Sequence, residues 1–284
     1  MELMKKALRE LLCVIPFFLT VLFAQKNDAT PGSSLPPGED DALTVLNASS
    51  RHGEWIDIPY GSGSIPLRAW IVYPERKEKA PVVIIIHEIF GVSDWIRSVA
   101  DRLAQDGFIA VAPDYLSGFG PNGGGTESIV SRDSVVRLIR SLSPEESYKR
   151  TDAVFEYAAK IPSANGKCAT VGFCWGGTRS FGYACVQPKL KAAVVYYGTS
   201  PDAQELSSLG APVLGLYGAD DARVVATVEP ASLEIKKLAK KYEYEIYEGA
   251  GHGFLRQQSG RDGSNLRASE KAWPRTLEFL KKHL

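Results

Sequence analysis

The chain has 284 residues, and its 44% hydrophobic and 23% charged residues are ordinary values for a globular protein with a sizeable core. Its 33 basic and 33 acidic residues cancel to a formal net charge of zero, and they form no basic stripe. Nucleic-acid-binding domains carry a basic patch, so we expect no nucleic-acid partner. The length is compatible with a single α/β domain.

The first 24 residues have the composition of a secretory signal peptide. Lys5, Lys6 and Arg9 precede an apolar run of 14 residues that ends at Ala24. That run is shorter than the roughly 20 residues that a membrane-spanning helix needs. We expect an exported protein, periplasmic or secreted, with no membrane contact beyond an uncleaved N-terminal anchor. The anchor remains an alternative because Leu22 stands where a cleavage site prefers a small residue.

Residues 25–50 are polar and rich in Pro, Gly and Ser, the composition of a disordered linker. Residues 51–284 then read as one domain without an internal repeat. The segments 54–60 and 65–74 alternate apolar and polar residues around "GSGS", a pattern that predicts an antiparallel hairpin. Residues 82–86 form a continuous β-branched run, which is typical of a central strand buried on both faces.

A repeated alternation of helices and strands follows this central strand. It predicts an α/β fold with a mostly parallel central sheet, the N-terminal antiparallel hairpin and helices on both faces. The expected helices are residues 93–107, 143–161, a segment from 175, 231–241 and about 269–283, and the expected strands are 108–115, 168–173, 191–198, 211–221 and 242–250.

The stretch "LSGFGPNGGGTES", residues 116–128, interrupts the alternation. It lacks the G-K-[ST] ending of a phosphate-binding loop, so the glycines indicate a mobile surface loop. Loops at the carboxyl ends of parallel strands surround ligand sites, and this one is a candidate lid.

"VGFCWGG" at residues 171–177 has the G-x-C-x-G spacing of a nucleophile elbow, with Cys174 in place of the usual serine. A strand leads into it and a helix follows, so the thiol should stand above the sheet at a helix N-terminus, where a thiolate is favoured. Glycines on both sides relieve crowding at such a strained turn. The alternative is a buried structural cysteine.

An acid and a histidine follow in the order that α/β-hydrolases use. "LYGADDARV" is a strand that ends in Asp220 and Asp221, and "YEGAGHGF" is a strand followed by His252. His252 would take the thiol proton and protonate the leaving group, and one aspartate would hold the imidazole. The pattern alone leaves open which aspartate does so.

Two backbone N–H groups are candidates for the oxyanion hole. The N–H of Trp175 follows the nucleophile directly, and the loop after "VVIIIHE" points to the N–H of Ile89. Glu88 then lies beside the thiol. It is either a nearby surface charge with no part in the reaction or a carboxylate that pairs with the thiol and controls when the thiolate forms.

"HEIFGV", "GFCWGG", "GADDARV" and "GHGFLR" together resemble the dienelactone hydrolase family of α/β-hydrolases over roughly residues 54–284. The resemblance implies a Cys-His-Asp triad that opens small cyclic enol-lactones, and its G-x-x-D-x-x-V motif selects Asp221. It implies that Glu88 is linked to the resting thiol and shifts when substrate binds. It also implies that Arg256, four residues after the histidine, binds the substrate carboxylate.

Two departures from the family bear on the substrate. The second substrate arginine has no clear counterpart, with Arg132 and Arg137 as candidates, and the signal peptide differs from the cytoplasmic lactone-opening members. For an exported chain, a disulfide between Cys168 and Cys185 is one option and two buried thiols the other. No close His, Cys and Glu set has metal-ligand spacing, so we expect neither metal nor cofactor.

The sequence therefore predicts a monomeric hydrolase of small esters or lactones that works through a thioester acyl-enzyme. Its site residues would be Cys174, Asp221, His252, Glu88, Ile89, Trp175 and Arg256. A broad carboxylesterase or thioesterase on the same triad is the alternative within enzymes. A binding module or a redox-active thiol on the same scaffold is the alternative from another class.

Overall fold

The computed structural model describes residues 34–61 and 65–284. The predicted signal peptide and the first part of the predicted linker lie outside these residues. Within the described part of the chain, no helix is both long enough and apolar enough to cross a membrane.

One eight-stranded sheet runs through the molecule in the order β1-β2-β4-β3-β5-β6-β7-β8. The first two strands pair antiparallel, with Trp55 opposite Trp70, and β2 joins β4 antiparallel. The other neighbours pair in parallel, which confirms the predicted mixed sheet with an N-terminal hairpin. The strands are β1 (Gly53–Ile58), β2 (Leu67–Val72), β3 (Ala80–Ile86), β4 (Ile109–Pro113), β5 (Ala164–Phe173), β6 (Ala192–Tyr196), β7 (Val213–Gly218) and β8 (Tyr242–Tyr247).

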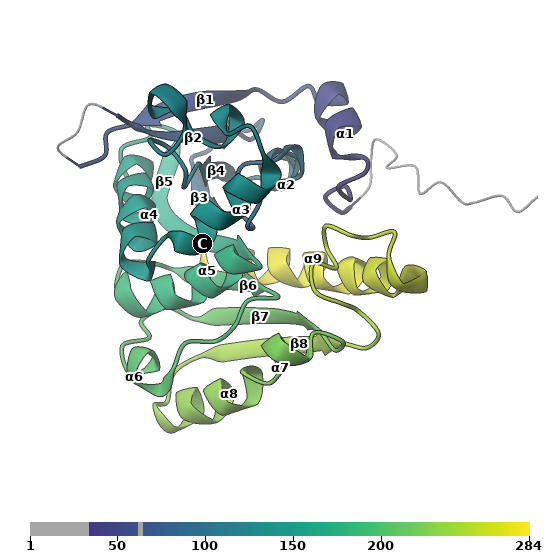
Figure 1. Ribbon diagram of the computed structural model, residues 1–284. Helices are drawn as coiled ribbons and strands as arrows, with labels where there is room; N and C mark the ends of the chain where they lie inside the picture. Colours follow the sequence, from purple (N-terminus) through teal and green to yellow (C-terminus); the bar gives the residue numbers. More distant parts are fainter. Residues whose placement is uncertain (1–33, 62–64) are drawn as a thin grey trace, which may run out of the picture.

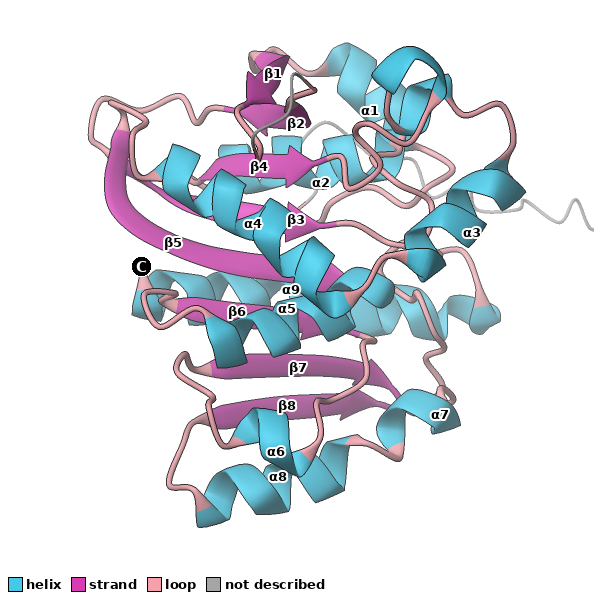
Figure 2. Ribbon diagram, turned by 60° about the vertical axis from the view of Figure 1, so that its left-hand side comes forward, coloured by secondary structure: helices cyan, strands magenta, loops and turns pink. Residues whose placement is uncertain are grey.

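Helices cover both faces of the sheet. The helices α2 and α9 lie on one face, and α4, α5 and α8 lie on the other (Figures 1 and 2). Apolar side chains of each pack against the sheet. The helices are α1 (Ala42–Ala48), α2 (Asp94–Gln105), α3 (Arg132–Ser141), α4 (Pro144–Ala158), α5 (Trp175–Val186), α6 (Ala203–Leu206), α7 (Ala222–Val225), α8 (Val228–Lys237) and α9 (Ser264–His283).

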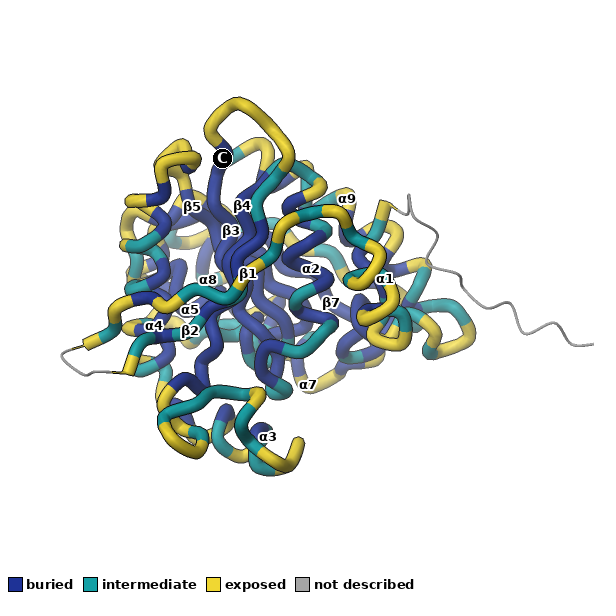
Figure 3. Tube along the Cα trace, turned by 90° about the horizontal axis from the view of Figure 1, so that it is seen from above, coloured by how far each residue is buried: buried dark blue, intermediate teal, exposed yellow. Residues whose placement is uncertain are grey.

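The central strands are buried as their sequence predicts. Every residue of β3 is buried, and so is every residue of β4, β6 and β7. Viewed from above, these strands form the dark interior of the molecule, with exposed loops around them (Figure 3). The carboxyl ends of the parallel strands meet at one edge of the sheet, where the candidate site residues lie.

The predicted disordered linker is wrong for residues 34–50. This segment contains α1, which packs against α2, with Ala42 fully buried. The carbonyl of Pro37 accepts a hydrogen bond from Trp95 Nε1 at 3.0 Å. Its polar composition hid Ala42, Val45 and Leu46, whose spacing of three and four residues turns one helical face toward the domain.

Further segments differ from the prediction: α3, the Gly-rich stretch, and the short helices α6 and α7, which were not predicted. The helix α3 was not predicted, although Ser131 caps it by accepting a hydrogen bond from Ser134 N. The Gly-rich stretch forms two short 3-10 turns, η1 (Pro121–Gly123) and η2 (Thr126–Ser128). Asp114 holds this stretch by accepting hydrogen bonds from the backbone N–H and the hydroxyl of Thr126, both at 2.7 Å.

Candidate active site

Cys174 stands at the turn between β5 and α5 in a conformation that residues other than glycine rarely adopt. Its φ is 56° and its ψ is −114°. Such strain persists where the surrounding packing enforces it, and it is common at functional sites. The backbone N–H of Cys174 donates to the carbonyl of Tyr196 at 3.0 Å, which fixes the turn to the neighbouring strand β6.

Glycines allow α5 to press against the sheet at this turn. A Cβ on Gly177 would lie 2.6 Å from the Tyr196 carbonyl, and one on Gly172 would lie 2.8 Å from Ser180 Cβ. A Cβ on Gly176 would meet the carbonyl of Ile86, the last residue of β3, and would lie 2.5 Å from the carbonyl of His87. The first turn of α5 therefore lies directly beside the loop that follows β3.

The thiol, an imidazole and a carboxylate form a continuous chain. Nε2 of His252 lies 3.0 Å from Sγ of Cys174, and Nδ1 lies 2.5 Å from Oδ2 of Asp221. Asp221 lies in the turn after β7, at the N-cap position of α7, and His252 lies in the loop after β8. The two loops are joined because the N–H of Asp220 donates to the carbonyl of Ala250 at 3.0 Å.

The structure separates the two adjacent aspartates. Asp221 is 9% exposed and faces the imidazole, whereas Asp220 pairs with Arg261 at the surface. Burial lowers the pKa of His252, but the hydrogen bonds of its ring to Asp221 and Cys174 outweigh burial and raise the pKa to about 10. The imidazole therefore holds a proton at neutral pH, so each of its ring nitrogens carries a hydrogen that it can donate.

The two candidate oxyanion donors belong to the first residue of α5 and to the loop that follows β3. Trp175 is the first residue of α5, so its N–H has no acceptor within the helix. Among the loop hydrogen bonds of the described residues, none uses the N–H of Ile89 as a donor. Both groups are thus available where α5 meets the end of β3.

Glu88 pairs with a different group from the one expected. Its carboxylate is 3% exposed and lies 2.6 Å from Nε of Arg256, so the structure places it in an ion pair rather than against the thiol. Burial raises the pKa of Glu88, and the charges of Arg256 and His252 oppose that rise. The pairing could not be read from the sequence because it depends on the rotamers of two residues that are distant in the chain.

Arg256 has three neighbours around its guanidinium group. Besides Glu88, it forms an ion pair with Glu39 of the N-terminal segment, and it lies 5.1 Å from the ring centre of Phe90. Arg132 stacks on the same ring at 3.9 Å. Of the two candidates for a second substrate arginine, the structure brings Arg132 toward Arg256.

Arg137, the other candidate, is exposed and donates to Ser134 within its own helix. This contact keeps its guanidinium on α3.

Tyr197 is a further residue beside the triad that no sequence motif indicates. Its side chain is fully buried, its φ is 41°, and its ring contacts those of His252 and Phe254. Its hydroxyl has no hydrogen-bond partner among the described residues. Burial raises the pKa of this phenol, and the charges of Glu88 and Cys174 raise it further. A positive φ on a tyrosine gives no signal in the sequence.

Two other cysteines lie within the described residues. Cys168 and Cys185 are buried free thiols, and burial raises the pKa of Cys185 to about 12. In the two described ranges, no three His, Cys, Asp or Glu side chains gather in a way that could hold a metal ion.

Comparison with known proteins agrees with this architecture. The family model described as "Dienelactone hydrolase family" matches residues 67–284. A Salmonella typhimurium protein named "Putative carboxymethylenebutenolidase" is 32% identical over 267 residues, which cover 86% of this chain and 95% of that protein. The "Carboxymethylenebutenolidase" of Pseudomonas putida is 30% identical over 216 residues, covering 74% of this chain and 89% of that one.

A solved structure from Klebsiella pneumoniae, described as a "Putative Dienelactone Hydrolase", superposes with a TM-score of 0.70. It shares 29% identity and covers 81% of this chain and 98% of its own. The match of the family model, the identities to relatives along most of their length, and the shared fold support one conclusion. The chain belongs to the dienelactone hydrolase family of the α/β-hydrolase superfamily.

Proposed function

We propose that the protein hydrolyses small esters or lactones through a Cys174-His252-Asp221 triad and a thioester acyl-enzyme. The observation that carries this proposal is the continuous contact from the Cys174 sulfur through the His252 imidazole to the Asp221 carboxylate. An elbow turn, a histidine and an orienting acid in this geometry are the parts that covalent acyl transfer requires.

In the first half of the reaction, the Cys174 thiolate attacks the ester carbonyl carbon and a C–S bond forms. The N–H groups of Ile89 and Trp175 would stabilise the negative charge that develops on the carbonyl oxygen. The C–O bond then breaks, and His252 gives its proton to the departing alkoxide. With a lactone, that hydroxyl stays attached to the acyl group.

In the second half, water attacks the thioester carbonyl while His252 accepts one of its protons. The C–S bond breaks, the carboxylic acid leaves, and the thiolate returns to its place beside the protonated His252. Asp221 keeps the imidazole in one orientation and stabilises its charged form throughout.

The positions of Arg256 and Arg132 fit a substrate that carries a carboxylate. Both guanidinium groups contact Phe90, next to the proposed oxyanion donor Ile89. Guanidinium groups bind carboxylates with paired hydrogen bonds. The names of two relatives, quoted above as carboxymethylenebutenolidases, agree with a carboxylate-bearing lactone as one substrate.

The test is hydrolysis of p-nitrophenyl acetate and of a small lactone panel by the wild type and by Cys174→Ala. We expect turnover of at least one substrate by the wild type and its loss in the variant. Absence of Cys174-dependent turnover on the whole panel would refute the proposal. It would then favour a binding or redox role for the thiol. Comparable rates on many unrelated esters would instead favour a broad carboxylesterase.

A further inference from the structure

The N-terminal segment places a carboxylate on the arginine of the proposed substrate site. Glu39 forms an ion pair with Nη1 of Arg256, and its backbone N–H donates to the Arg256 carbonyl at 2.9 Å. Arg256 itself is 8% exposed, so little of its charge meets solvent. The segment thus meets both the side chain and the backbone of this residue.

The contact does not depend on a loose tail, because the segment is held on both sides of Glu39. On one side, the carbonyl of Pro36 accepts from Gln258 at 2.9 Å and that of Pro37 accepts from Trp95. On the other side, Asp40 accepts from Ser259 Oγ at 3.2 Å. These contacts hold Glu39 within reach of the guanidinium group.

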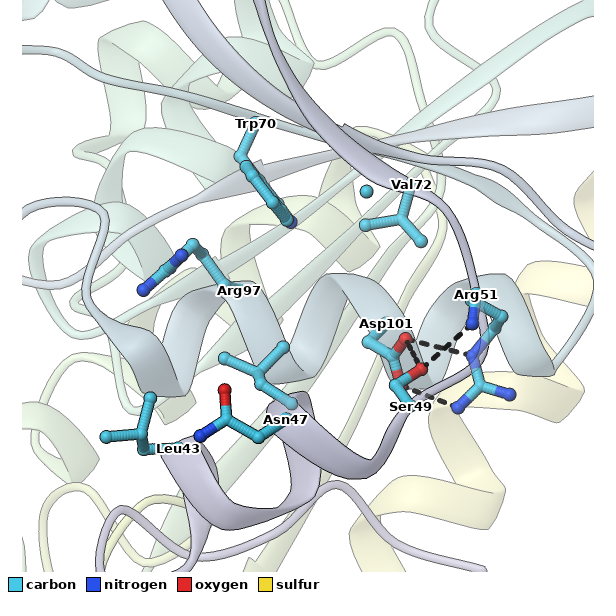
Figure 4. A pocket seen from close by; sticks show the side chains of 10 residues that line it. Leu43, Asn47, Ser49, Arg51, Trp70, Val72, Arg97 and Asp101 are labelled. Carbon is cyan, nitrogen blue, oxygen red and sulfur yellow. Dashed lines mark hydrogen bonds and ion pairs between the residues drawn. The ribbon is translucent and has the colours of Figure 1, made fainter.

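Beyond α1, a second anchor fixes the segment to the domain. Ser49 donates to Asp101 of α2 at 2.6 Å, and Arg51 forms an ion pair with the same carboxylate (Figure 4). This anchor borders a cavity of about 250 Å³ between α1, α2 and the first hairpin. The segment is therefore attached to the domain before and after Glu39.

The two acidic partners of Arg256 occupy different sides of it. The Glu88 side chain is 4% exposed and lies on the buried side, whereas the Glu39 side chain is 37% exposed and lies toward solvent. An incoming carboxylate can take the solvent-facing position only if Glu39 leaves it. Because the Glu39 side chain is partly exposed, its displacement moves its charge into water, and the incoming carboxylate takes over the pairing with Arg256.

We propose that Glu39 determines the substrate charge preference of this site by competing with the substrate carboxylate for Arg256. The inference rests on the proposed function and adds a residue from the N-terminal segment to it. With Glu39 in place, Arg256 is already paired, so a carboxylate-bearing ester gains less from this arginine than it would from an unpaired one. Without the Glu39 carboxylate, the N–H donors of Arg256 that it occupies are available to a substrate carboxylate. The negative charge that would repel such a substrate is also removed.

The experiment compares two substrates that differ in charge but share a leaving group and a similar acyl length, mono-4-nitrophenyl glutarate and 4-nitrophenyl pentanoate. In Glu39→Gln, the ratio of kcat/KM for the anionic ester to kcat/KM for the neutral ester should rise about tenfold. The matched control is Asp40→Asn, which removes the same charge from the same segment without touching Arg256. Its ratio should stay at the wild-type value.

Two results would overturn the inference. Either Glu39→Gln leaves the ratio unchanged, or Asp40→Asn raises it equally, which would show a general charge effect. A ratio is used because a merely structural loss would lower both rates together.

Glutarate binding provides a readout that does not need turnover. Measured by calorimetry in a Cys174→Ala background, the Kd for glutarate should fall about tenfold on adding Glu39→Gln, and an unchanged Kd would overturn the inference. Turnover that survives Cys174→Ala would refute the proposed function alone, since glutarate binding would still decide the role of Glu39.

Discussion

Replacing Asp221 with Asn should lower the proton affinity of His252, whereas replacing its neighbour Asp220 should not. Asp221 is 9% exposed and its Oδ2 lies 2.5 Å from Nδ1 of the imidazole. A hydrogen bond to a charged group contributes about 1.5–3 kcal/mol, and a factor of ten is about 1.4 kcal/mol. The proton affinity should therefore fall about tenfold to a hundredfold. Asp220→Asn is the matched control because Asp220 pairs with Arg261 at the surface.

The assay is an NMR titration of histidine-labelled protein. The chain has four histidines, so the signal of His252 is identified by its absence in His252→Gln. In the wild type, His252 should titrate with a pKa of about 10. In Asp221→Asn, the titration midpoint of His252 should fall by about 1 to 2 pH units. An equal movement with Asp220→Asn, or none with Asp221→Asn, would refute the assignment of Asp221.

Three further predictions concern stability, each measured by urea unfolding. Gly172→Ala should lower the free energy of unfolding by about 1–3 kcal/mol, because the new Cβ would meet the backbone of Gly176. In the control Gly210→Ala, the nearest atom to the new Cβ is 3.7 Å away, so the free energy of unfolding should change by no more than about 0.5 kcal/mol. The folded-state pKa of His252 lies above the unfolded value of about 6.5, so its stabilising effect is complete below that pH and is lost as the pH rises through about 10. The free energy of unfolding of the wild type should therefore fall as the pH rises through about 10, and that of His252→Gln should fall less. Tyr197→Phe removes a hydroxyl that has no hydrogen-bond partner among the described residues, so the free energy of unfolding should hardly change. A decrease of more than about 1 kcal/mol would contradict the placement of this hydroxyl.

The parts of the site that the sequence could predict follow from local rules. The buried β-branched run of β3 and the glycines around Cys174 specify a central strand and an elbow without reference to the rest of the chain. The order of Cys174, an aspartate and His252 then follows from where parallel strands end. The geometry agrees with the choice of Asp221 over Asp220, which the motif resemblance had favoured.

The parts that could not be predicted depend on contacts between distant segments. Glu88 could be placed near the thiol from its position, but its pairing with Arg256 depends on the loop that follows β8. Glu39 lies in a polar segment whose composition indicates disorder, and only its contacts with Arg256 and its neighbours show why it is ordered. Burial of the Tyr197 hydroxyl likewise arises from packing around the site.

The central claim is that the acyl group passes through the sulfur of Cys174. Rapid acid quenching of the wild type with p-nitrophenyl acetate, followed by peptide mass spectrometry, tests it most directly. We expect one acetyl group on the peptide that contains Cys174, removable by neutral hydroxylamine as a thioester is, together with a burst of nitrophenol. Turnover that persists in Cys174→Ala, or an acyl group attached to another residue during turnover, would contradict the account.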